Sequence, residues 1–160
     1  MSPVKVSVLY IGKTGEKYLQ QGEAVYQKRL GHYLPITFQV VPDIKGAGKL
    51  PTDLLRQREA EAVLSRLQST DRLILLDEGG KQYSSVDFAQ WLDKELQRPA
   101  RRLVFLVGGA FGFDAALYER ADGKLSLSKM TFSHQMVRLF LTEQLYRAMT
   151  ILRNEKYHNE

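Results

Sequence analysis

Three short segments hold most of the residue types that could do chemistry, and each follows an apolar run of strand length. They are residues 77–81 (Asp-Glu-Gly-Gly-Lys), 108–113 (Gly-Gly-Ala-Phe-Gly-Phe) and 128–134 (Ser-Lys-Met-Thr-Phe-Ser-His). In an open parallel sheet, ligands bind beyond the carboxyl ends of the strands. We therefore expect the three segments to line one composite pocket.

The glycines of segment 108–113 would let backbone N–H groups approach a phosphate just ahead of a helix. Their spacing matches neither G-x-G-x-x-G nor the P-loop motif, and a glycine-rich turn without a ligand is the alternative interpretation. After Leu127, the third segment interleaves Met130 and Phe132 with Ser128 and Thr131. An apolar lining with a few polar groups suits an adenine ring better than a triphosphate.

Polar residues are also dense near the end of the chain, at Arg138, Glu143, Arg147, Arg153, Tyr157 and His158. A solvated tail is one interpretation, because chain ends are usually poorly ordered. The alternative is that Tyr157 and His158 bind an unpaired RNA base while the arginines bind phosphates.

Several other chemistries have no support in the sequence. The chain has no cysteine, which excludes disulfides, a thiol nucleophile and a Cys-ligated metal. His32, His134 and His158 lack the spacing of metal ligands, so we expect no metal, and no G-x-S-x-G elbow occurs. Asp77 and Glu78 could act as an acid or base, but a solvated loop is the more common explanation for such a pair, and the pair is given no role.

The length of 160 residues predicts a single domain covering residues 1–160. A hydrophobic fraction of 44% excludes intrinsic disorder, and 23 basic against 18 acidic residues give a net charge of +5 and a moderately basic surface. The longest apolar runs are too short to span a membrane, and the N-terminus does not resemble a secretory signal. We expect a cytoplasmic protein without a membrane partner.

Strand-length apolar runs alternate with stretches of helical period, which predicts an α/β fold with a mostly parallel sheet and helices on both faces. Strands are expected at 4–11, 36–41, 72–76, 103–107 and 124–127. Helices are expected at 16–30, at 53–67, from Ser84 or Ser85 to before Pro99, from Asp114 to 122, and at 135–153. The linker at 42–51, with two glycines and two lysines, is either a plain connection or a basic loop that contacts RNA phosphates.

The last predicted helix is apolar on two sides. Met136, Leu139 and Tyr146 add apolar surface opposite its main stripe. One interpretation is that this helix is central, with both faces covered within one subunit. The other is that one face packs on the sheet and the opposite face packs on a second copy of the chain. We favour the second interpretation, a homodimer, because a small domain has few elements to cover both faces.

The order of these motifs closely resembles the RlmH family of ribosomal RNA methyltransferases. The resemblance is carried by Leu-Leu-Asp at 75–77, Val-Gly-Gly-Ala-Phe-Gly at 107–112, the run from Leu125 to Arg138, Glu-Gln-Leu-Tyr-Arg-Ala at 143–148 and Tyr157-His158. These motifs occur in order across nearly the whole chain, in a protein of the right length.

The resemblance implies a SPOUT-type fold with a C-terminal trefoil knot, which pattern reasoning alone would not propose, since knots are almost absent from proteins. It also implies a homodimer that binds S-adenosylmethionine in the knot. The positions that match the family's cofactor contacts are Leu76, Gly108, Leu127, Ser128, Lys129, Met130, Thr131 and Phe132.

The activity implied by the resemblance is methylation of N3 of a pseudouridine in 23S ribosomal RNA, on assembled ribosomes, by metal-independent in-line transfer. The chain would align the reactants and help N3 lose its proton. The catalytic candidates are His158, Tyr157, Arg147 and His134. Two alternatives from other classes are a ribosome-assembly factor without catalysis and an enzyme that binds nucleotide phosphates at segment 108–113.

Overall fold

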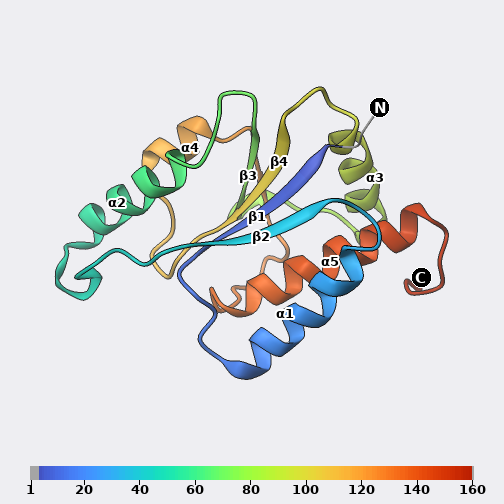
Figure 1. The fold of residues 1–160 in the computed structure, drawn as a ribbon, viewed down its shortest axis with the longest axis horizontal. Helices are drawn as coiled ribbons and strands as arrows, with labels where there is room; N and C mark the ends of the chain where they lie inside the picture. Colours follow the sequence, from blue (N-terminus) through green and yellow to red (C-terminus); the bar gives the residue numbers. More distant parts are fainter. Residues whose placement is uncertain (1–3, 160) are drawn as a thin grey trace.

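The computed structural model describes residues 4–159, and the predicted α/β architecture is confirmed for them. The sheet consists of β1 (Lys5–Ile11), β2 (Ile36–Val41), β3 (Arg72–Lys81), β4 (Arg102–Val107) and β5 (Gly123–Leu125). The helices are α1 (Lys17–Leu30), α2 (Thr52–Leu64), α3 (Ser85–Leu96), α4 (Ala115–Arg120) and α5 (Met136–Leu152), with a 3-10 turn at Ala47–Lys49 inside the predicted linker. The strand order is β2-β1-β4-β3-β5, and all neighbouring strands are parallel (Figure 1).

Helices cover both faces of the sheet, as expected for parallel strands that are buried on both sides (Figure 1). Side-chain alternation divides the core in two. Val8 and Phe105 belong to the core under α1, α3 and α5, whereas their neighbours Leu9 and Leu106 belong to the core under α2 and α4. The sheet thus holds the carboxyl ends of β3, β4 and β5 in fixed positions.

Two helix starts follow the predicted capping residues. The Ser84 side chain accepts a hydrogen bond from the Asp87 backbone N–H at 3.1 Å and begins α3, and Asp114 accepts one from Ala116 at 3.0 Å and begins α4. The two caps fix the first turns of the helices that follow segments 77–81 and 108–113.

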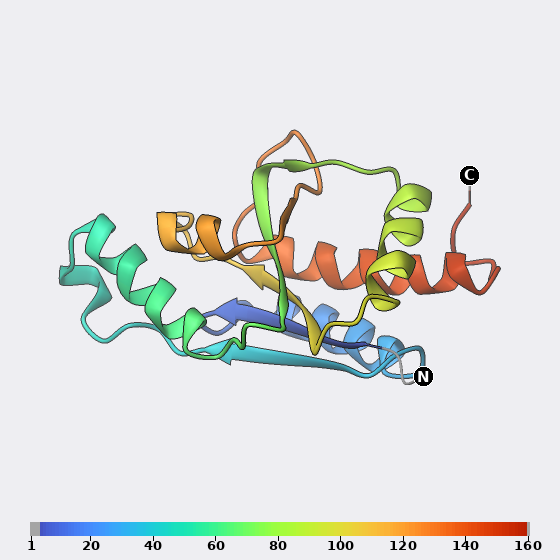
Figure 2. The same cartoon turned by 90° about the horizontal axis from the view of Figure 1, so that it is seen from above.

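The segment expected as a loop at 77–81 is instead the end of β3, so that prediction was wrong. Lys81 pairs with Leu125 after an irregularity in register, and the Lys81 carbonyl accepts a hydrogen bond from the Ser126 N–H at 3.0 Å. Gly80 makes the close passage possible, since a Cβ there would lie 2.7 Å from backbone atoms of Lys124 and Leu125. Figure 2 shows this part of the chain rising from the sheet before it turns to α3. The trefoil knot stays a prediction. The close contact between the end of β3 and β5 is consistent with it.

The other differences are at element ends. The second helix stops at Leu64 instead of 67, because the N–H groups of Arg66 and Leu67 bond carbonyls three residues back and tighten the last turn. β5 ends at Leu125 instead of 127. These shifts leave the predicted order of elements unchanged.

The far side of α5 is largely covered within the chain. Leu139 lies against Gly22 of α1, where a Cβ would come 3.1 Å from it, and the Tyr146 ring packs on Tyr26 and Tyr33. Met136 keeps 36% of its surface exposed. The two-sided pattern is thus explained mainly by a central position inside one subunit and does not require a second copy.

A buried guanidinium fixes α5 to the end of β1. Arg138 is fully buried and donates hydrogen bonds to the carbonyls of Ile11 (2.7 Å) and Gly12 (2.9 Å) and to Thr14 Oγ1 (3.1 Å). Thr14 donates in turn to the buried Glu23 carboxylate at 3.1 Å. Burial lowers the pKa of Arg138 and raises the pKa of Glu23, so each group depends on the other's charge.

Candidate functional site

A cleft of about 470 Å³ lies where β3, β4 and β5 end, at the edge of the sheet expected to bind a ligand. All three predicted segments contribute to it, as the single-pocket hypothesis requires. The lining consists of residues 76–78, 107–110, 112, 113, 125–128, 130–134 and 137.

Gly108 allows tight packing at the floor of the cleft. A Cβ at this position would lie 2.7 Å from the ring of Phe113, which is itself buried and packed edge-on against Tyr118. Any larger residue must displace that ring. The glycine is therefore needed for close approach, and the ring keeps the wall of the cleft apolar.

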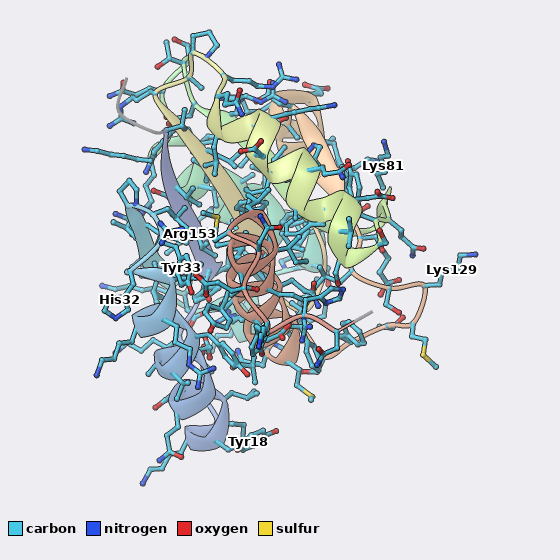
Figure 3. All side chains as sticks on the ribbon, turned by 90° about the vertical axis from the view of Figure 1, so that its right-hand side faces the viewer. Tyr18, His32, Tyr33, Lys81, Lys129 and Arg153 are labelled. Atoms are coloured by element: carbon cyan, nitrogen blue, oxygen red, sulfur yellow. The ribbon has the colours of Figure 1, made fainter. Side chains whose placement is uncertain are left out.

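Seven of the eight predicted cofactor positions line this cleft: Leu76, Gly108, Leu127, Ser128, Met130, Thr131 and Phe132. Lys129 does not, and its side chain extends away from the body of the protein (Figure 3). The neighbouring turn is held locally, because the Ser128 hydroxyl accepts a hydrogen bond from the Met130 N–H at 2.9 Å. His134, one of the four catalytic candidates, also lines the cleft.

The carboxylates of Asp77 and Glu78, left without a role by the sequence, both lie in the cleft wall. Asp77 Oδ1 accepts a hydrogen bond from the Tyr118 hydroxyl at 2.7 Å, and Oδ2 accepts one from the Gly79 N–H at 3.1 Å. Burial, together with this bond to Asp77, raises the pKa of Tyr118 to about 12 and keeps the phenol a donor. The wall thus presents negative charge beside apolar side chains.

The other three catalytic candidates form a second cluster, centred on Glu143 of α5. Glu143 Oε1 accepts hydrogen bonds from Arg147 at 2.6 Å and from the Tyr157 hydroxyl at 2.9 Å. Arg147 lies 3.0 Å from His158 Nδ1, and its Cζ lies 4.7 Å from the centre of the Tyr157 ring. The tail therefore folds back on α5 instead of extending into solvent.

Hydrogen bonding in this cluster restricts what each group can do. A guanidinium can only donate, so His158 Nδ1 accepts from Arg147, and the proton of a neutral ring is on Nε2. Burial, and then hydrogen bonds with Tyr26 and Glu143, raise the pKa of Tyr157 well above its usual range. Tyr157 is thus a hydrogen-bond donor and not a base near neutral pH.

Glu143 and Tyr26 are the members of this cluster that the sequence did not single out as site residues. The i, i+4 spacing of Glu143 and Arg147 could have indicated that pair. Tyr26, whose hydroxyl lies 3.4 Å from that of Tyr157, comes from α1 and had no local signal.

The cleft and the tail cluster are far apart within one chain. Val137 lines the cleft and Arg147 holds His158, and ten helical residues separate them by about 15 Å. Figures 1 and 2 show the chain turning back after α5, so that its C-terminal end lies beside the last turns of that helix. The four catalytic candidates are therefore not brought together in one copy.

Comparisons with known proteins identify the family. A family model described as "Predicted SPOUT methyltransferase" matches residues 4–158. The chain belongs to the SPOUT methyltransferase family. Two curated relatives named "Ribosomal RNA large subunit methyltransferase H" are 51% identical in Cytophaga hutchinsonii and 48% identical in Parabacteroides distasonis, each over 98% of this chain and 100% of the relative.

Membership of the SPOUT methyltransferases implies an enzyme that uses a methyl donor. Among residues 4–159, no three His, Asp or Glu side chains are grouped as a metal site. None of the helices in this described part of the chain is long and apolar enough to cross a membrane.

Proposed function

We propose that this SPOUT methyltransferase transfers a methyl group from S-adenosylmethionine to N3 of a pseudouridine in 23S ribosomal RNA, acting on assembled ribosomes. The observation that carries the proposal is the cleft at the ends of β3, β4 and β5, combined with near-complete coverage of relatives that are named as large-subunit rRNA methyltransferases.

The residues of the cleft fit S-adenosylmethionine. Its volume lies within the range of about 300 to 1,000 Å³ that small-molecule sites occupy. Leu76, Leu127 and Phe132 would hold the adenine ring, and the carboxylates of Asp77 and Glu78 would face the positive charge of the donor. When bound, the donor supplies a methyl group on a sulfonium, so no metal is required to activate it.

The tail cluster supplies the groups that would hold the RNA base. His158 is held by Arg147 through Nδ1, Tyr157 packs against the same guanidinium, and both rings would contact the base. The positive charge of Arg147 would stabilise the anion that forms when N3 loses its proton. His134 lies at the cleft and would help to orient the target there.

These roles require two copies of the chain. Reacting atoms must approach to about 3–3.5 Å, whereas the cleft and the tail of one chain are separated by about 15 Å of α5. We infer a homodimer in which the tail of one copy reaches the cleft of the other. The ribosome in the cytoplasm is the proposed partner, and neither a membrane nor a metal takes part.

The test is methyl transfer from labelled S-adenosylmethionine to unmethylated whole ribosomes, free large subunits and naked 23S RNA, with mass spectrometry of the nucleosides. We expect label on a pseudouridine, with whole ribosomes the best substrate. Label on another nucleoside would refute the target. Absence of label on all three substrates, despite cofactor binding, would refute the proposed RNA.

A further inference from the structure

Two exposed arginines at the ends of α1 and α5 are held by aromatic rings instead of by carboxylates. Arg29 Cζ lies 5.3 Å from the centre of the Tyr26 ring and 5.5 Å from that of Tyr146. Arg153 Cζ lies 4.5 Å from the centre of the Tyr33 ring, and its Nη2 donates to the Tyr33 carbonyl at 3.4 Å. Figure 3 shows Tyr33 and Arg153 side by side, with His32 near them.

The charge of these arginines is not neutralised locally. Within residues 4–159, seven other arginines form ion pairs with carboxylates, and none of these pairs includes Arg29 or Arg153. Two exposed lysines add charge nearby in the sequence: Lys28 precedes Arg29, and Lys156 lies three positions after Arg153. Across segments 26–33 and 150–159, the single carboxylate is that of Glu155, which accepts a hydrogen bond from the Tyr33 hydroxyl at 2.6 Å.

Ring contacts orient a guanidinium while leaving its positive charge available. The planar fork of arginine matches a phosphate with two parallel hydrogen bonds. Because side-chain freedom is already reduced, less is lost when a phosphate binds. Arg29 and Arg153 thus have the properties of prepared phosphate ligands.

This surface is continuous with the tail cluster. Tyr146, one of the rings under Arg29, packs edge-on against Tyr157 with ring centres 4.7 Å apart. It also contacts Tyr33, the ring under Arg153, at 5.8 Å. A nucleotide at Tyr157 and His158 would therefore have its neighbours in the strand within reach of the two arginines.

We propose that Arg29 and Arg153 bind backbone phosphates of a single-stranded RNA segment on one side of the target nucleotide. RNA is favoured over an acidic protein because the arginines are interleaved with tyrosines, which suit splayed bases. The proposal rests on the proposed function, since it places the target nucleotide at the tail.

The first test measures binding of a fluorescein-labelled 20-nucleotide single-stranded RNA over a KCl series. Each lost phosphate contact lowers the slope of log K against log salt by about 0.7 for single strands. The double variant Arg29→Gln/Arg153→Gln should therefore lose about 1.4 from the slope. Arg58→Gln is the matched control, because Arg58 is an exposed arginine of α2, on the opposite face of the sheet, and has no ion pair in the described chain.

A second variant separates geometry from charge. Arg29→Lys keeps the positive charge but loses the planar fork, so we expect the salt slope of the wild type with weaker binding. With ribosomes as substrate, the double variant should raise KM and leave kcat unchanged. Thermal unfolding should be unaltered in all variants, because the changed side chains are exposed.

Equal slopes for the double variant and the wild type, or no measurable RNA binding by the wild type, would overturn the proposal. Normal binding and the expected change of slope, combined with no methyl transfer by the wild type, would refute the proposed function while the binding surface stands.

Discussion

Replacing Arg138 with Met tests how the structure fixes α5, the helix that links the cleft to the tail. Methionine retains an unbranched side chain but donates no hydrogen bonds, so the carbonyls of Ile11 and Gly12 lose their buried partners. Each unsatisfied buried group costs about 1–3 kcal/mol. The Glu23 carboxylate also loses the nearby positive charge that favours its ionised form.

We expect the free energy of unfolding to fall by about 4 kcal/mol, which corresponds to a Tm lower by about 8–16 °C for a chain of this size. Thermal and urea unfolding at fixed protein concentration would measure this loss. Arg58→Met, a change at an exposed site on α2, should alter stability by less than about 0.5 kcal/mol.

A double-mutant cycle tests the electrostatic part of the argument. Glu23→Gln removes the buried carboxylate that Arg138→Met leaves without its cation, so the double variant should be more stable than the sum of the single losses predicts. We expect a coupling of about 1 kcal/mol or more. Additive losses, or a loss below about 1 kcal/mol for Arg138→Met alone, would refute the reasoning.

Three further predictions concern the site and its support. Gly80→Ala should destabilise the protein by about 1–3 kcal/mol in urea unfolding, because the new Cβ would meet backbone atoms of β5. Gly79→Ala is the control, since a Cβ there would meet only the Asp77 side chain. Equal losses of stability in the two variants would contradict the close contact between Gly80 and β5. Burial raises the pKa of Glu23 in the folded protein, so as the pH rises above about 4.5 the carboxyl group loses its proton first in the unfolded state. The free energy of unfolding of the wild type should therefore fall relative to that of Glu23→Gln as the pH rises from about 4.5. If the two proteins changed equally with pH, the effect of burial on Glu23 would be contradicted. Tyr157→Phe should slow transfer and leave the shape of the pH–rate profile unchanged below about pH 9, since the raised pKa of Tyr157 keeps it protonated. If the variant lost a limb on which the wild-type rate rises with pH, Tyr157 would be shown to act as a base.

Local pattern was sufficient to predict the parallel sheet and the pocket at its carboxyl edge. Apolar runs such as 103–107 are buried on both faces of the sheet, and their length and composition predict strands. Ser84 and Asp114 are typical N-cap residues and predict the starts of the helices that they cap. Segments 108–113 and 128–134 line the cleft because strand ends in a parallel sheet lie at one edge.

Contacts between distant residues were not predictable in this way. Lys81 pairs with Leu125 because Gly80, which has no Cβ, lets the end of β3 lie close to the backbone of β5. From the sequence alone, Gly79 and Gly80 predicted a loop instead. The tail cluster depends on Tyr26, which lies 131 positions from its partner Tyr157. The apolar far side of α5 likewise indicated a second copy, because the sequence does not show that α1 covers it.

The most direct test of the central claim is methyl transfer by mixed dimers. Thr131→Trp would fill the cleft and abolish cofactor binding, whereas His158→Ala would retain cofactor binding and slow transfer, so each variant alone should be nearly inactive. After 1:1 mixing and exchange of subunits, each mixed dimer has one intact cleft facing one intact tail, and we expect about a quarter of wild-type methylation of ribosomes. No recovery in mixtures shown to contain mixed dimers would contradict a site that is built from the cleft of one copy and the tail of another.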